Sequence, residues 1–195
     1  MPNINQMSLN KKLNIDFSNG LRSILRQDPD VIMIGEIRDE ETANMAVRAS
    51  ITGHKVYSTI HCRSAREVYI RLENMGVKPY LLSDALVGII SQRLIKTLCE
   101  ECKEIDKENS VNERKIYKKC GCKICNYSGY GGRKIISAVY ILEEKNKKKI
   151  EELHEDSSYL SNENMKYDLE KLLYEGKISK DDYSEFIEGE RLNEF

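Results

Sequence analysis

The chain has 195 residues, a length that accommodates one domain or a domain with a small appendage. Its residues are 40% hydrophobic, enough for a core, and the longest apolar run, residues 85–90, is too short to span a membrane. Charged residues make up 32% but the net charge is only −1, which gives no support for a dedicated nucleic-acid binder. The N-terminus lacks the apolar stretch of a signal peptide, so we expect a cytoplasmic protein whose clustered cysteines bind metal rather than form disulfides.

Residues 30–37 read DVIMIGEI and predict a short strand, because a continuous apolar run is typical of strands buried on both faces of a parallel sheet. Asp39 is placed to cap a following helix, and Gly53 is placed to end it. The apolar residues of this helix recur at helical spacing: Ala43, Ala46, Val47 and Ile51. Residues 54–61, HKVYSTIH, predict a second strand because β-branched and aromatic side chains dominate them.

A capping-box pattern at residues 64–67 predicts the next helix, and residues 79–98 predict another. Strand, helix, strand and helix in this order indicate an α/β fold with a parallel sheet and flanking helices. Further along, residues 135–142 predict a strand. The charged remainder, residues 145–195, is expected to be helical, with a loose segment at residues 156–164.

Glu36 directly follows the last apolar residues of the first predicted strand, beside Gly35. Ligands of open α/β sheets bind outside the carboxyl ends of the strands, where a carboxylate holds a Mg²⁺-bound water or orients a water that attacks a nucleotide phosphate. The alternative is a surface glutamate that ends a strand and pairs with Arg38.

Arginines and histidines near this carboxylate leave two interpretations open. Arg22 and Arg26 are four residues apart, so on a helix they form either a solvated face or a pair of phosphate donors. His54 and His61 flank the second predicted strand, and His61 falls at the same sheet edge as Glu36. Both histidines are structural on one interpretation; on the other, His61 hydrogen-bonds a phosphate or carries a conformational signal.

Two CxxC pairs, Cys99 with Cys102 and Cys122 with Cys125, are separated by residues 103–121. This spacing predicts a tetrahedral zinc site, and four thiolates leave no open position for catalysis, so the zinc is expected to be structural. Cys120 is a possible substitute for Cys122, but the spacing to Cys125 favours Cys122. Free thiols are the alternative.

Taken together, the stretch from LRSILRQDPDVIMIGEIRDEE to TGHKVYSTIH resembles the ATPases of type II secretion and type IV pilus assembly. The similarity continues through MGVKPYLLSDALVGIISQRLIKTLC to GCKICNYSGYGGR, and covers roughly residues 1–145. It implies a RecA-like fold in a hexameric ring, with ATP and Mg²⁺ between subunits and an inner-membrane platform protein as partner. It also implies a tetracysteine zinc subdomain.

By this resemblance Glu36 is the Walker B glutamate that polarises the attacking water, and His61 is the histidine-box residue that senses the γ-phosphate. Arg22 and Arg26 act on the nucleotide of a neighbouring subunit. The surroundings of the nucleotide and Mg²⁺ include Asp30, His54 and Arg38.

The sequence departs from the family because it contains no phosphate-binding GxxxxGK[ST] loop. Its single Gly-Lys pair, Gly176-Lys177, is followed by Ile178 and has no glycine five residues earlier. We therefore interpret the chain as the C-terminal portion of such an ATPase, expected to be inactive by itself and to expose apolar surface along residues 31–34.

We expect three parts: a partial RecA-like core (residues 1–98), a zinc subdomain (99–134), and a last strand with a helical tail (135–195). The expected role is to couple ATP hydrolysis to pilus assembly or type II secretion, at the inner face of the cell membrane and without nucleic acid. The alternatives are a zinc-ribbon binding module, with nucleic acid as a candidate partner, and a non-catalytic assembly partner of a split ATPase.

Overall fold

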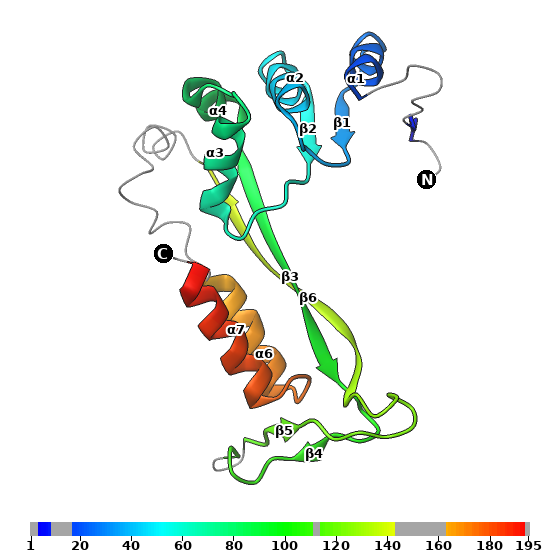
Figure 1. Ribbon diagram of the computed structural model, residues 1–195, viewed down its shortest axis with the longest axis vertical. Helices are drawn as coiled ribbons and strands as arrows, with labels where there is room; N and C mark the ends of the chain where they lie inside the picture. Colours follow the sequence, from blue (N-terminus) through cyan, green and yellow to red (C-terminus); the bar gives the residue numbers. More distant parts are fainter. Residues whose placement is uncertain (1–3, 9–16, 111–113, 143–162, 194–195) are drawn as a thin grey trace. The chain divides into compact units, whose positions relative to one another are not determined.

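The computed structural model describes residues 4–8, 17–110, 114–142 and 163–193, which fall into two units (Figure 1). One unit holds the described residues up to Val87 together with Ile141 and Leu142, and the other holds Gly88–Tyr140 and the C-terminal helices. This grouping differs from the three parts expected from the sequence, because the strand that precedes the cysteines lies in the same unit as the cysteines and the tail.

The first unit contains the parallel strand pair that the sequence predicts. Strands β1 (Val31–Ile34) and β2 (Lys55–Ser58) run parallel, with Val31 opposite Lys55 and Ile34 opposite Ser58. Helix α2 (Glu40–Ile51) connects them, as parallel strands require. Both strands and the helix between them are confirmed.

Side-chain caps fix where the helices of this unit begin. The Asp39 carboxylate accepts a hydrogen bond from the Thr42 N–H at 2.9 Å, which starts α2 as predicted. The Ser64 hydroxyl accepts from the Glu67 N–H and starts α3 (Ala65–Asn74). The unit also contains α1 (Phe17–Leu25) and α4 (Pro79–Ala85).

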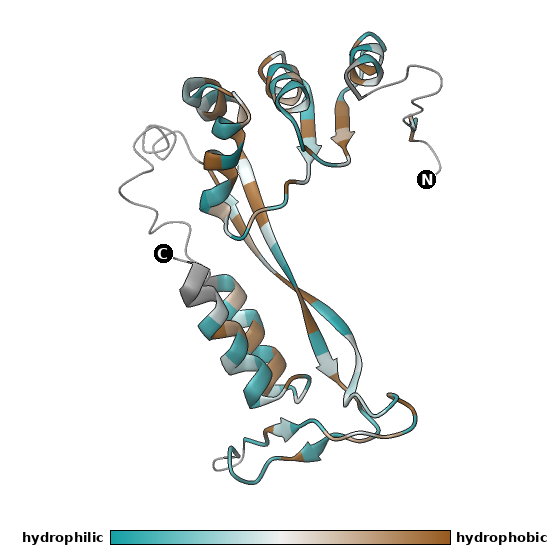
Figure 2. Cartoon of the chain, viewed as in Figure 1, coloured by the Kyte–Doolittle hydropathy of each residue, from teal (hydrophilic) through white to brown (hydrophobic). Residues whose placement is uncertain are grey.

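Strand β1 is buried on one face, not on both. Ile32 and Ile34 are 3% and 2% exposed, whereas Val31 and Met33 on the opposite face are 55% and 65% exposed. The apolar character of the strand is visible in Figure 2. The expectation of exposed apolar surface at residues 31–34 is therefore confirmed for alternate side chains, and the expectation of a strand covered on both faces is wrong for this chain.

The helix predicted for residues 79–98 is only half correct. Its first part forms α4, but β3 (Gly88–Leu98) is a strand that pairs with β6 (Tyr130–Ile141). The two strands run antiparallel (Figure 1), since Leu142 N–H donates to the Val87 carbonyl at one end of the ribbon and Gly131 lies against Cys99 at the other. Apolar residues here fit both periods, and the strand partner that decides the outcome lies far along the chain.

A short hairpin and two helices complete the second unit. Strands β4 (Glu104–Ile105) and β5 (Tyr117–Lys118) pair antiparallel. The helical tail is confirmed as α6 (Glu163–Tyr174) and α7 (Lys180–Asn193); most of the loose segment predicted at 156–164 lies outside the described residues. The side chains most deeply buried in this tail are Met165, Leu169 and Ile178.

Within the described ranges, no helix combines the length and the apolar character needed to cross a membrane.

Candidate functional site

Glu36, Arg38 and His61 come together where β1 and β2 end. The Arg38 guanidinium binds both carboxylate oxygens of Glu36: Nη2 donates to Oε2 at 2.7 Å, and Nε donates to Oε1. His61 Nε2 lies 3.7 Å from Oε1 of the same carboxylate. The carboxylate thus lies at the carboxyl edge of the strands and is also paired with Arg38, and its role toward a nucleotide stays a prediction.

The Glu36 carboxyl is held in its ionised form. The hydrogen bond from Arg38 lowers its pKa below the ordinary value, and the charges of Arg38 and His61 act in the same direction. An ionised carboxylate accepts hydrogen bonds only, so Glu36 is suited to orient a water molecule.

Thr59, which no sequence motif marks, fixes the turn that carries Glu36. Its hydroxyl donates to the Gly35 carbonyl at 2.7 Å, and its own carbonyl accepts from the Ile37 N–H at 2.9 Å. The residues on both sides of Glu36 are therefore bound to one residue just beyond β2. Thr59 falls inside the predicted strand at residues 54–61, so no signal in the sequence set it apart.

The two arginines predicted to share a helix do not do so. Arg22 lies in the last turn of α1, but the helix ends at Leu25, and Arg26 falls in the turn that follows. Arg22 Nη2 is 3.4 Å from Glu41 Oε1, with both side chains more than half exposed. Each guanidinium remains exposed to solvent within the described chain.

Asp30 and His54 lie at the amino ends of β1 and β2, away from Glu36. The Asp30 carbonyl accepts from the Lys55 N–H at 3.0 Å. His54 Nδ1 is 3.0 Å from the Ala49 carbonyl oxygen. Because a carbonyl oxygen can only accept a hydrogen bond, Nδ1 carries the proton and donates it. This hydrogen bond joins the end of α2 to the start of β2. Four-residue strands separate the two edges by roughly 10 Å. The assignment of Asp30, His54 and Arg38 to the nucleotide surroundings stays a prediction.

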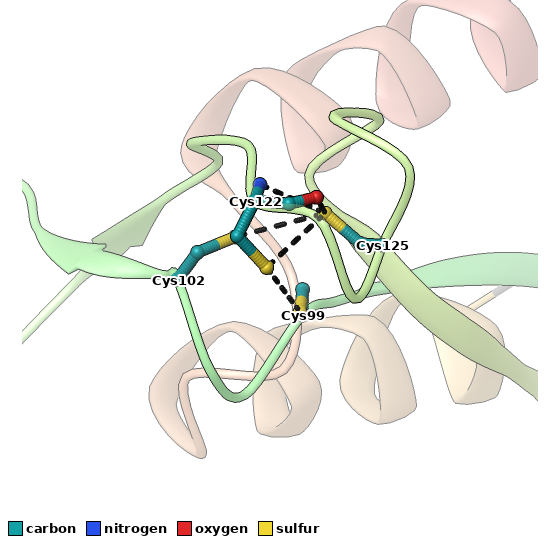
Figure 3. A group of neighbouring side chains, drawn as sticks. All are labelled: Cys99, Cys102, Cys122 and Cys125. Carbon is teal, nitrogen blue, oxygen red and sulfur yellow. Dashed lines mark hydrogen bonds between the residues drawn. The ribbon is translucent and has the colours of Figure 1, made fainter.

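The second candidate site is the four-cysteine cluster, where two loops turn their sulfurs toward one point (Figure 3). The four sulfur atoms lie within 4.8 Å of one another, with Cys99–Cys122 at 4.0 Å and Cys102–Cys125 at 3.8 Å. Zinc–sulfur bonds of about 2.3 Å in a tetrahedron place the sulfurs about 3.8 Å apart. The spacing of the cluster therefore suits a tetrahedral zinc ion.

Backbone donors make one of these thiols a good metal ligand. Cys125 Sγ accepts from the N–H groups of Cys122 and Gly129, each at 3.3 Å, and the Cys122 bond is the main cause that lowers its pKa to about 6. The chain reaches this geometry through left-handed residues at Asn126 and Tyr127. Metal ligation needs the thiolate, so this loop is prepared for a cation.

Cys120 and Cys62 are not part of the cluster. Burial and a hydrogen bond with Glu104 raise the pKa of the Cys120 thiol, which keeps it protonated. Cys62, in the other unit, is half-buried, and burial raises its pKa as well. The choice of Cys122 over Cys120, made from spacing, agrees with this grouping.

Comparison with known proteins places this arrangement in a class. The crystal structure of the pilus retraction motor PilT with bound ADP is 29% identical and matches with a TM-score of 0.63, covering 87% of this chain and 43% of that one. The ATPase DotB of Legionella pneumophila matches with a TM-score of 0.63 at 21% identity, covering 89% of this chain and 42% of that chain, which shows the fold alone. The chain thus has the α/β fold of secretion and pilus ATPases.

Proteins of similar sequence belong to the same class as these structural neighbours. The family described as type II/IV secretion system protein matches residues 1–183. Type II secretion system ATPase E of Vibrio cholerae is 45% identical over 151 residues, covering 72% of this chain and 30% of the relative. Type IV pilus assembly ATPase PilB of Thermus thermophilus is 40% identical over 157 residues, covering 74% and 18%. The chain belongs to the type II/IV secretion system protein family, and it spans less than a third of the length of these curated relatives.

Proposed function

We propose that this chain is the C-terminal portion of the motor of a type II secretion or type IV pilus machine, and that Glu36 is its hydrolytic carboxylate. The observation that carries the proposal is the position of Glu36: an ionised carboxylate at the carboxyl end of β1, with His61 Nε2 3.7 Å away, in a chain of this family. Ligands of open α/β sheets bind at this edge.

Glu36, Arg38 and His61 each have a separate role in the proposed hydrolysis. Glu36 orients the attacking water and accepts its proton, while Mg²⁺ and the bound nucleotide are the substrate complex that the intact motor supplies. Between turnovers Arg38 holds the carboxylate in place through two hydrogen bonds. These bonds must break before a water molecule can reach both carboxylate oxygens. His61, with a side chain 82% exposed, is free to contact a phosphate that arrives at this edge.

Nucleotide binding needs groups that these 195 residues do not contain. The sequence has no GxxxxGK[ST] loop, and Gly176-Lys177 lies in the turn between α6 and α7. We propose that this polypeptide alone does not hydrolyse ATP. In the complete motor Arg22 and Arg26, both exposed, would contact the nucleotide of a neighbouring subunit in a hexameric ring, and the ring would act on an inner-membrane platform protein.

We further propose that the four cysteines hold a structural Zn²⁺ and that the core is a partial RecA-like sheet. The metal would supply only cross-linking, since four thiolates fill its coordination sphere. The sulfur spacing and the thiolate-stabilising N–H donors at Cys125 support zinc; the parallel β1–β2 pair and the likeness to PilT support the core.

The test is a chimera in which this chain replaces the matched region of type II secretion system ATPase E of Vibrio cholerae. The chimera should hydrolyse ATP, and Glu36→Gln should abolish turnover. Glu73→Gln is the matched control, because Glu73 is an exposed glutamate of α3 in the same unit and the substitution removes the same charge. Turnover that survives Glu36→Gln would contradict the role of Glu36, and ATP hydrolysis by the chain alone would contradict its proposed inactivity.

A further inference from the structure

The turn between α6 and α7 is a rigid unit made by local sequence. Lys177 N–H donates to the Leu172 carbonyl and Gly176 N–H to that of Leu173, with Gly176 at φ +67°, which is a Schellman ending of α6. Ser179 and Asp182 then cap α7 reciprocally, since each accepts a bond from the backbone N–H of the other. These hydrogen bonds fix the backbone conformation of the turn.

The turn between α6 and α7 contacts the loops that carry the four cysteines. Leu98 N–H, directly before Cys99, donates to the Lys177 carbonyl at 2.7 Å. Lys103 Nζ, directly after Cys102, donates to the Gly176 carbonyl at 2.9 Å and lies 4.9 Å from the centre of the Tyr117 ring. The first cysteine loop, residues 99–102, is therefore flanked on both sides by residues that bind the turn.

Ion pairs and one tyrosine extend this contact. Glu100, between the two cysteines of the first loop, pairs with both Lys103 and Lys177. Tyr130, which follows the second loop, donates from its hydroxyl to Asp182 Oδ1 at 2.7 Å. A Cβ added to Gly176 would lie 2.6 Å from the Tyr117 ring, which shows how closely the turn approaches.

Backbone pairing and the four sulfurs together hold this surface in shape. Cys99 N–H donates to the Gly129 carbonyl at 2.9 Å, the β3–β6 and β4–β5 pairs flank the loops, and the four sulfurs join the loop tips. Exposed polar loops of this kind fold when a metal closes them. Removing the metal would therefore loosen the loop that presents Glu100 and Lys103 to the turn.

We propose that the metal-bound cysteine loops are the docking surface of the α6–α7 pair, so that binding of Zn²⁺ and docking of the C-terminal helices are coupled. The coupling does not depend on ATP hydrolysis. It makes the position of the tail a consequence of metal occupancy, through Leu98, Glu100 and Lys103, which adjoin Cys99 and Cys102.

The test compares the full chain, zinc-loaded and stripped by a thiol-compatible chelator under reducing conditions, by amide hydrogen exchange. With zinc, the Leu98 N–H and the peptides of α6 and α7 should exchange slowly; without it, at least about tenfold faster. Peptides of α2, in the other unit, should not change and serve as the internal folding control. Equal protection of α6 and α7 with and without metal would overturn the proposal.

A second arm changes the docking contact while keeping all cysteines. Tyr130→Phe removes the hydroxyl that binds Asp182, whereas Tyr127→Phe makes the same change three residues earlier, on a tyrosine that is 69% exposed. Both variants should retain one zinc per chain, but only Tyr130→Phe should speed exchange in α7. Equal exchange in the two variants would contradict docking through this loop.

Discussion

The hydroxyl of Thr59 donates a 2.7 Å hydrogen bond to the carbonyl of Gly35, the residue before Glu36. Thr59→Val should therefore loosen the turn and lower the free energy of unfolding by about 0.5–1.5 kcal/mol, the usual net contribution of one hydrogen bond. Urea unfolding of the chain measures this. Thr59→Ser keeps the hydroxyl and should restore most of the loss; if Val and Ser behave alike, the hydrogen bond is not what stabilises the turn.

Arg38→Ala should raise the pKa of the Glu36 carboxyl toward its ordinary value of 4.5, because the main cause of its lowered pKa is the hydrogen bond from Arg38. Since the folded pKa lies below the unfolded one, the Glu36–Arg38 pair stabilises the fold above about pH 4.5, and its contribution is lost as the pH falls through the folded value. Carboxyl ¹³C NMR titration of Glu36 follows the shift. An unchanged midpoint in the variant would show that Arg38 does not hold the carboxylate in solution.

The purified chain should bind one zinc ion, and Cys99→Ser should remove most of it. Cys120→Ser should leave the metal content unchanged, since the Cys120 sulfur lies outside the group formed by the other four. Elemental analysis after dialysis against a weak chelator measures both. Loss of zinc in the Cys120 variant would mean that the second loop uses a different pair of ligands.

Neighbouring isoleucines on β6 should differ sharply in their contribution to stability. Ile136 is 1% exposed and Ile135 is 62% exposed, because successive side chains of a strand point to opposite faces. Ile136→Ala should cost about 2–5 kcal/mol and Ile135→Ala no more than about 0.5 kcal/mol. Equal costs in thermal or chemical unfolding would contradict the orientation of this strand.

Local patterns were enough to predict the β1–α2–β2 unit. The cap at Asp39, the apolar spacing in α2 and the β-branched residues of β2 each act within a few residues, and each appears in the structure as expected. The same holds for the cysteine pairs, whose spacing predicts their convergence.

Long-range contacts explain what local patterns missed. The local pattern of β3 predicts a helix, because its strand partner β6 begins 32 residues after β3 ends, as their bounds at Leu98 and Tyr130 show. Thr59 gained its role only when β2 lay beside the turn at Gly35, and the contact between Lys177 and Leu98 joins two segments that no periodicity connects. Arg26 lies outside α1 because the helix ends at Leu25 and the backbone turns at Asp28, which has φ +50°.

The measurement that tests the central claim most directly is the steady-state ATP turnover of the chimera described above, with and without Glu36→Gln. If Glu36 is the hydrolytic carboxylate, the substitution should lower kcat by about 10²–10⁴-fold while nucleotide binding is retained, and Glu73→Gln should keep the parent rate. A Glu36→Gln chimera that turns over ATP at the parent rate would contradict the account.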